Sequence, residues 1–268
     1  MKRTRAWLVE GVLPPLAFFA VVAAAWQAAT SLWAIPVYLV PGPERVLGAA
    51  REHAGALWSA MQLTGSAALA GFILSLLAGI ALALIFSQSR IIQRSMYPYA
   101  IFLQTVPIVA IAPLLIMWFG NGFGGVVAVS FILSLFPIVT NATAGLTAVD
   151  PNLLELFEIH NASRWQALFK LRLPNAVPNL VTGAKISCGL SVIGAIVGEI
   201  SAGFGTQSFG LGTLITMATG KLDTAYAFAA VLSSTVLSIA IFAAVSSIGA
   251  TILARWHTAA ARNSTTHR

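Results

Sequence analysis

The chain has 268 residues, of which 58% are hydrophobic and only 9% are charged, and its mean hydropathy is +0.86. Because a soluble domain of this size carries roughly a quarter charged residues, the composition excludes an ordinary soluble protein and indicates a polytopic membrane protein. The formal net charge of +7 is therefore interpreted through its distribution across a membrane rather than as a sign of nucleic-acid binding, and the single cysteine, Cys188, excludes an intrachain disulfide and a cysteine metal cluster.

Apolar stretches long enough to cross a bilayer recur along the chain, since a spanning helix needs ~20 residues. We expect about six spans, at 11–34, 62–86, 97–119, 124–147, 176–200 and 224–254. The fold class predicted is thus an all-α polytopic membrane protein with a single transmembrane domain over 1–268. The basic residues before the first span resemble the start of a signal peptide, but the length of the apolar run from Val12 to Trp33 favours a retained helix.

Residues 42–58, between the first two spans, predict a short amphipathic helix lying at the outer surface. Its apolar face consists of Val46, Leu47, Ala50 and Ala54. A plain connector is the alternative.

The polar stretch 150–174 predicts two short capped helices joined by a turn. Asp150 is a preferred N-cap, and Pro151 is favoured at the first helical position because its missing N–H has no partner there. Asn161 can adopt the left-handed conformation that ends a helix. The first helix is therefore expected to end at this residue.

Ser163 and Gln166 form a Ser-x-x-Gln capping box that starts the second helix, and Pro174 ends that helix or begins the next span. We expect the two helices to lie nearly at right angles. Their charged side chains would face water or a partner, namely Glu155, Glu158, Arg164, Lys170 and Arg172. A DNA-binding helix–turn–helix is disfavoured because spans flank the segment closely, and a purely structural loop is the alternative to a docking element.

Two charged residues lie within the fifth span, Lys185 and Glu199. They are ~21 Å apart along a helix and cannot pair with each other. Lys185 is expected to snorkel to the inner interface, with a substrate role as the alternative. Glu199 is expected to gate the pore, to bond the glycine-rich outer loop 203–212, or to pair across a dimer. That loop does not match a phosphate loop, since no Gly-Lys-Ser/Thr follows.

The basic residues predict the topology. With the N-terminus inside, the cytoplasmic segments hold Lys2, Arg3, Arg5, Arg90, Arg94, Arg164, Lys170, Arg172, Arg255, Arg262 and Arg268. The outer segments hold only Arg45, Arg51 and Lys221. We therefore expect both termini, the 150–174 segment and the polar tail 257–268 in the cytoplasm.

At 150–174 the chain resembles the EAA loop of ABC importer permeases. The pattern of that loop is Glu-Ala-Ala, three residues, Gly, nine residues, an aliphatic, one residue and Leu-Pro. Glu155 takes the Glu place and Asn161 the Gly place, and the tail is Leu171, Leu173 and Pro174. Further stretches are similar to permeases of the nitrate, sulfonate/taurine and bicarbonate importers, namely 40–43, 111–120, 162–166, 198–199 and 210–215.

Two departures from the pattern are that Leu156 and Phe157 replace the Ala-Ala pair and that Asn161 replaces the Gly. Asn still makes the turn, whereas the bulkier pair alters how the loop seats in a partner. Within this family, the particular sequences at 161–174 and 193–199 favour the permeases assigned to riboflavin or pyrimidine-precursor uptake.

The resemblance implies a type I (MetI-like) importer permease in a bacterial inner membrane. Its implied partners are a second permease copy, two cytoplasmic ABC ATPase subunits and an extracytoplasmic solute-binding protein. The chain lacks a Gly-x-x-x-x-Gly-Lys-Ser/Thr loop, so we expect no cofactor and no metal on it, and ATP and magnesium in the ATPase subunits. The residues expected to couple the chain to the ATPase are Glu155, Leu156, Phe157, Glu158, Asn161, Ala162, Ser163, Arg164, Trp165, Leu173 and Pro174.

Polar positions in the apolar spans are the candidates for lining the translocation pathway. They are Gln104, Thr105, Pro107, Ser130, Ser134, Asn141, Ser187, Ser191 and Glu199. Pro107 frees backbone groups that must face protein or water. The alternative for each hydroxyl is a bond to its own helix or to a neighbouring one.

Two rival classes fit less well. A membrane-embedded enzyme needs clustered catalytic groups, but the chain has only eight acidic residues, and its four histidines show no metal-ligand spacing. An ATP-independent secondary transporter needs coupling carboxylates within the spans, and only Glu199 is available. The substrate stays open among nitrate, sulfonates, bicarbonate, a pyrimidine precursor and riboflavin.

Overall fold

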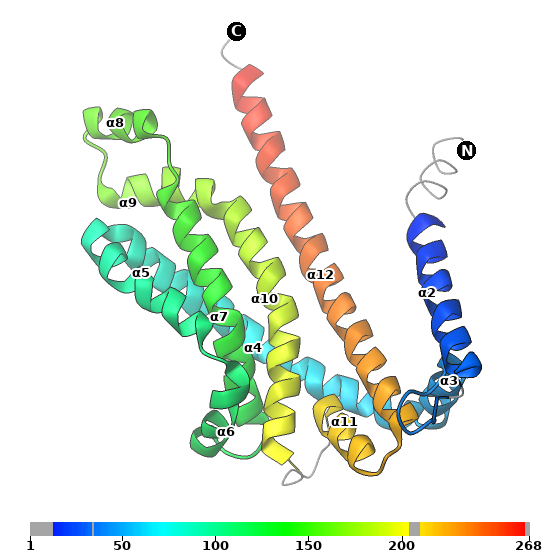
Figure 1. Ribbon diagram of the computed structural model, residues 1–268. Helices are drawn as coiled ribbons and strands as arrows, with labels where there is room; N and C mark the ends of the chain where they lie inside the picture. Colours follow the sequence, from blue (N-terminus) through cyan, green and yellow to red (C-terminus); the bar gives the residue numbers. More distant parts are fainter. Residues whose placement is uncertain (1–12, 34, 204–209, 266–268) are drawn as a thin grey trace. The chain divides into compact units, whose positions relative to one another are not determined.

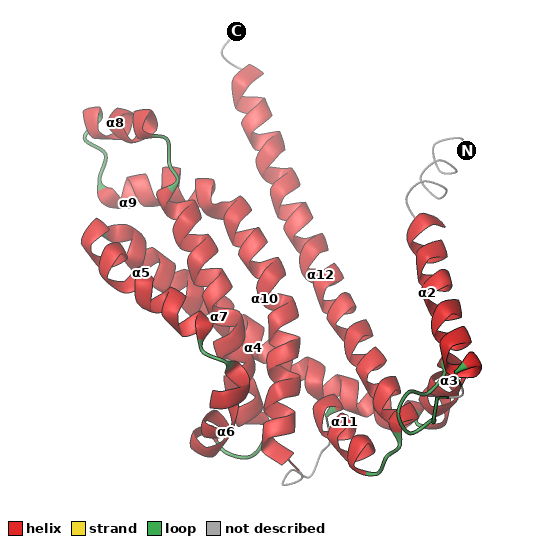
Figure 2. Cartoon of the chain, in the orientation of Figure 1, coloured by secondary structure: helices red, strands yellow, loops and turns green. Residues whose placement is uncertain are grey.

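The computed structural model describes residues 13–33, 35–203 and 210–265, and within these ranges every regular element is helical (Figure 2). The prediction of an all-α fold is therefore confirmed. The chain divides into two compact units, one formed by residues 1–59 and 214–233 and the other by residues 60–213 and 234–268. The predicted cytoplasmic residues Lys2, Arg3 and Arg5 lie outside the described part, as do 204–209 of the glycine-rich loop.

The first unit brings the beginning of the chain together with a later segment. It contains α2 (Leu13–Leu32), α3 (Pro43–Glu52) and parts of α4 (Ala54–Gln88), α11 (Leu211–Gly220) and α12 (Thr224–Thr265) (Figure 1). The rings of Trp26 and Phe228 lie 5.8 Å apart and those of His53 and Tyr226 4.2 Å apart. These contacts tie α2 and the α3–α4 junction to the start of α12.

Most of the stretch 42–58 is helical, with its last residues belonging to α4 rather than to α3. Pro43 begins α3 after the extended Gly42, as its fixed φ favours. Of the expected apolar face, Val46 is buried, whereas Leu47 is 57% exposed. The two side chains thus do not share one buried surface within the described structure.

The second unit holds the segment 150–174 and the helices packed around it. It contains most of α4 and of α12, together with α5 (Arg90–Thr105), α6 (Ile108–Phe119), α7 (Phe123–Thr147), α8 (Pro151–Ile159), α9 (Arg164–Ala167), a π-helical turn (Leu168–Arg172) and α10 (Leu173–Ala202). The most extensive packing is between α7 and α10, which lie side by side (Figure 1). Cys188 is fully buried in the core of this unit, as expected of a small packing residue.

Close approach of α7 and α10 depends on a glycine. A Cβ on Gly194 of α10 would lie 2.7 Å from the Cα of Ser130 on α7. Such backbone proximity is typical of membrane helices that associate through small residues.

Four helical runs in the described part are long and apolar enough to cross a membrane, namely Ala54–Gln88, Phe123–Thr147, Arg164–Ala202 and Thr224–Ala254. The stretches 62–86, 124–147, 176–200 and 224–254 fall within them. The stretch 97–119 differs, because it is divided into α5 and α6 at Pro107, which lacks the N–H that a continuous helix needs. The stretch 11–34 contains α2, and the number of six spans stays a prediction.

Candidate functional site

The first helix of the 150–174 segment forms as predicted. The backbone N–H of Asn152 donates to Asp150 Oδ1 over 2.9 Å, and Pro151 is the first residue of α8. Asn161 ends the turn after α8 with a φ of 53°, in the left-handed region. The predicted N-cap and helix end are therefore confirmed.

The second helix begins as predicted, and at Pro174 it leads into the next span. Ser163 and Gln166 make both bonds of the capping box, at 3.2 and 2.8 Å. From Arg164 the helix continues through a π-helical turn into α10, so it is not an independent short helix. The wider turn directly precedes Pro174, whose ring would crowd the carbonyl of Lys170 in a regular α-helix.

The 150–174 segment is firmly attached to the spanning helices. Leu168 is buried in a cluster with Ala83 of α4 and Leu146 of α7. Arg172 Nη1 donates to the carbonyl of Ser87 at the end of α4 over 2.7 Å. Asn175 Nδ2 donates to the carbonyls of Gly145 and Ala148 at the end of α7, over 3.1 and 2.9 Å. A force on this segment is therefore transmitted to α4, α7 and α10 together.

The same segment carries apolar side chains with no covering protein in the described structure. They are Leu153, Leu156, Ile159, Trp165 and Phe169, which are 44 to 76% exposed. The Trp165 and Phe169 rings stack with centroids 6.1 Å apart. Exposed apolar side chains gathered on one segment are typical of an interaction surface, and a docking role for these residues stays a prediction. We call these five residues the apolar docking patch.

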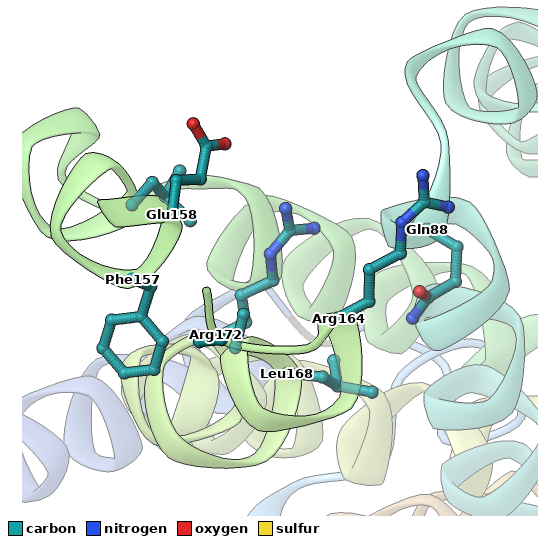
Figure 3. Close-up of a pocket in the computed structure, with 9 residues that line it drawn as sticks. Gln88, Phe157, Glu158, Arg164, Leu168 and Arg172 are labelled. Carbon is teal, nitrogen blue, oxygen red and sulfur yellow. The ribbon is translucent and has the colours of Figure 1, made fainter. Parts of the chain in front are cut away.

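Two hollows flank the half-buried Phe157, which lines both. One, of about 290 Å³, is lined by Gln88, Leu154, Phe157, Glu158, Ala162, Arg164, Ala167, Leu168 and Arg172 (Figure 3). The other, of about 350 Å³, is lined by Leu156, Phe157, His160, Ala162, Gln166 and Lys170. The bulky Phe157, which departs from the Ala-Ala pattern, thus contributes to two concave surfaces, together with Ala162.

The remaining predicted coupling residues surround these surfaces. Glu155, Glu158 and Arg164 are exposed, and none of them makes an ion pair within the described part of the chain. Leu173 and Pro174 are half-buried at the start of α10, on the segment that joins the patch to the spans.

The four predicted pathway serines are fully buried, and their hydroxyls bond to their own helix or to a neighbouring one. Ser130 Oγ on α7 donates to the Ser191 carbonyl on α10 over 2.9 Å, and Ser187 Oγ donates back to the Ser134 carbonyl over 2.7 Å. The hydroxyls of Ser134 and Ser75 of α4 are 2.8 Å apart. In this structure the serines join α4, α7 and α10, and a pathway role for them stays a prediction.

The other pathway candidates are distributed over α5 and α7. Thr105 is exposed and donates to the Phe102 carbonyl over 2.7 Å, beside the helix break at Pro107. Asn141 is half-buried, and its Nδ2 donates to the Pro137 carbonyl over 2.8 Å. The side chain of Gln104 lies outside the described part.

Glu199 lies at the centre of a buried hydrogen-bonded cluster. Thr64 Oγ1 of α4 donates to Glu199 Oε1 over 2.7 Å, and the Gly212 N–H donates to Oε2 over 2.8 Å. The Leu211 N–H in turn donates to Thr64 Oγ1 over 2.9 Å. The carboxylate and hydroxyl thereby cap the first residues of α11. Of the three expected roles, bonding of the glycine-rich loop is confirmed at Gly212, its last residue, and the other two stay predictions.

Two glycines next to Glu199 leave room for this cluster. A Cβ on Gly210 would overlap the Glu199 carboxylate, and a Cβ on Gly212 would lie 2.5 Å from the Ile196 carbonyl oxygen. Sequence reasoning missed Thr64, since one threonine in an apolar span gives no signal of its distant partner. It also missed Gln88, which the chain fold brings to the first hollow.

An apolar groove of about 350 Å³ lies between α4, α10 and α12, and only apolar side chains and Gly249 line it. The stem of Lys185 is close by, with its Cε 3.6 Å from where a Cβ on Gly249 would be. Lys185 thus packs its aliphatic part along α12, as a snorkelling lysine does.

The sequence of the chain is similar to those of known transport components. Residues 71–263 match the family described as the binding-protein-dependent transport system inner membrane component. A probable ABC transporter permease protein of Haemophilus influenzae is 33% identical over 231 residues, covering 86% of this chain and 93% of that protein. The riboflavin transport system permease protein of Chloroflexus aurantiacus is 32% identical, covering 86% and 85%. The formylaminopyrimidine transport permease protein of Halalkalibacterium halodurans is 32% identical, covering 70% and 75%.

Proposed function

The chain belongs to the family of inner membrane components of binding-protein-dependent transport systems and is the permease component of an ABC importer, and on that premise we propose how it works. Two copies of the chain form the solute pathway. Two cytoplasmic ATPase subunits dock on their 150–174 segments, and an extracytoplasmic binding protein delivers the solute. Both termini lie in the cytoplasm.

The observation that carries this proposal is the apolar docking patch on a segment bonded to three spanning helices. Leu168, Arg172 and Asn175 attach that segment to α4, α7 and α10. The patch supplies the apolar centre that partner surfaces bury. ATP and magnesium are held by the ATPase subunits, and closure of those subunits pulls the segment and the attached helices as one body.

We propose an uncharged nitrogen heterocycle as the transported solute. Two of the relatives reported above are named for riboflavin and formylaminopyrimidine transport. The scarcity of charged side chains in the predicted spans fits a solute without charge at least as well as an inorganic anion. Uptake of labelled riboflavin and of labelled nitrate by proteoliposomes containing the whole importer distinguishes the two classes, and preferential ATP-dependent nitrate uptake would contradict this assignment.

The docking proposal is tested by replacing one exposed charge. Glu155→Arg is expected to weaken retention of the ATPase subunits by at least ~5-fold, equivalent to ~1 kcal/mol, because it changes the rim of the docking patch. Quantitative pull-down of the tagged chain measures this retention. Glu44→Arg, on the exposed surface of α3, is the matched control and should retain the subunits normally. Equal retention by all three proteins would contradict the proposed surface.

A further inference from the structure

The first hollow is a basic pocket at a membrane boundary. Its lining includes Gln88, the last residue of α4, and Arg172, the last residue before α10. Both α4 and the run that contains α10 are long and apolar enough to span a membrane. The hollow therefore lies next to the ends of the predicted spans 62–86 and 176–200, which is where lipid headgroups are expected.

Two arginines give the hollow its chemistry. Figure 3 shows the guanidinium groups of Arg164 and Arg172 extending to the same side, with Gln88 near Arg164. Arg172 uses one donor on the Ser87 carbonyl, which fixes its position. A guanidinium carries five N–H donors, so most donors of both arginines stay available for a ligand. No acidic group pairs with either arginine in the described structure, although Glu158 also lines the hollow.

We propose that this hollow binds the phosphate of an anionic phospholipid headgroup. Arginine forks match phosphate oxygens in geometry and charge, and basic pockets between membrane helices bind anionic headgroups. A volume of about 290 Å³ holds roughly ten waters at ~30 Å³ each, enough for a phosphate and its glycerol ester. Leu154, Phe157 and Leu168 provide apolar wall for the ester region.

A headgroup fits the hollow better than an acidic side chain of a protein partner. On α8, the exposed Leu156 and Ile159 lie on a different face from Leu154 and Glu158, which line the hollow. A partner that covers Leu156 and Ile159 therefore approaches another side of α8. The proposed lipid site does not depend on the proposed function, because its expected position in the membrane rests on where the predicted span in α4 ends, and not on an ATPase partner.

Lipid titration of the purified full-length chain, followed by native mass spectrometry, tests the proposal. Arg164→Gln is expected to weaken binding of phosphatidylglycerol about 5-fold, the loss for one basic group at ~1 kcal/mol, and to leave phosphatidylcholine binding unchanged. Arg94→Gln removes the same charge from exposed α5 without lining the hollow, and should change phosphatidylglycerol binding less than ~2-fold. Glu158→Gln removes the acidic group of the hollow and should strengthen binding.

Three results would overturn the proposal. Equal losses of phosphatidylglycerol binding in Arg164→Gln and Arg94→Gln would mean that the net charge of the chain, and not the hollow, attracts the lipid. Displacement of phosphatidylglycerol by an equal concentration of inorganic phosphate would make free phosphate the ligand. Unchanged lipid binding by Arg164→Gln, with loss of co-purifying ATPase, would assign the hollow to a partner carboxylate.

Discussion

The side chains of Glu199 and Thr64 cap the first residues of α11. Their bonds satisfy the N–H groups of Leu211 and Gly212. Buried polar groups left without partners cost ~1–3 kcal/mol each. The cap therefore stabilises the fold only as a complete set of bonds.

Thr64→Val keeps the shape of the side chain but removes its hydroxyl. It should destabilise the protein by about 1–3 kcal/mol, because the Leu211 N–H and Glu199 Oε1 each lose a partner. Thermal unfolding in detergent measures the effect, and Thr64→Ser, which restores the hydroxyl, should unfold close to the wild-type temperature. A Thr64→Val protein as stable as the wild type would show that the cap contributes nothing.

Asn161 makes a second residue-level prediction. Its φ of 53° suits Asn and Gly but not a β-branched residue. Asn161→Gly should preserve the turn and ATPase binding, whereas Asn161→Val should cost roughly 1–2 kcal/mol and loosen the docking segment. Pull-down of the ATPase subunits with each variant gives the comparison, and equal binding by the two variants would disprove the requirement for a left-handed residue.

At the level of elements, the close pair α7 and α10 forms the centre of the second unit. Gly194→Ala would place a methyl group 2.7 Å from the Ser130 Cα, so the helices must separate. Overpacking of this kind costs about 1–3 kcal/mol. Gly189→Ala on the same helix meets nothing within 4 Å and is the control. The unfolding temperature should fall only for Gly194→Ala. Equal temperatures for both variants would mean that α7 and α10 can separate at Gly194 without loss of stability.

Local signals made the elements of the docking segment predictable, since Asp150, Asn161 and the Ser163–Gln166 box act within a few residues of chain. For Pro174 the sequence predicts either the end of the second helix or the start of the next span, and the structure has the second, with Pro174 in the first turn of α10. The π-helical turn that joins the two helices leaves no pattern in the sequence. The division of 97–119 follows from Pro107, but apolar length alone suggested one span.

The hydrogen-bond partners of the candidate site residues could not be predicted, because they lie far away in the sequence. The serine and glutamate positions were recognised as polar groups in apolar spans, yet their partners come from other helices, such as Ser191 for Ser130 and Thr64 for Glu199. Hydropathy and spacing do not encode which helices are neighbours. The coupling segment was accessible to sequence reasoning because its signals are local and its pattern resembles a family.

For the whole molecule, the distribution of basic residues predicts which side of the membrane each segment occupies. Ser163 and Ser59 are both exposed and are predicted on opposite sides. The test uses a chain that carries Cys188→Ala, so that the introduced cysteine is the only one. In this background, Ser59→Cys should react with an impermeant maleimide added to spheroplasts, whose inner membrane is intact. Ser163→Cys should react only in inverted vesicles. The reverse pattern would overturn the proposed topology.

We propose that this permease couples solute transport to ATPase subunits through the 150–174 segment. The most direct test is ATP hydrolysis by the tagged chain, purified in mild detergent with the products of its native gene neighbours and returned to lipid vesicles. We expect an ATPase to co-purify, its activity to rise when the solute-loaded binding protein is added, and that rise to be lost in Glu155→Arg. An assembly that contains no ATPase, or one whose stimulation is unchanged by Glu155→Arg, would contradict it.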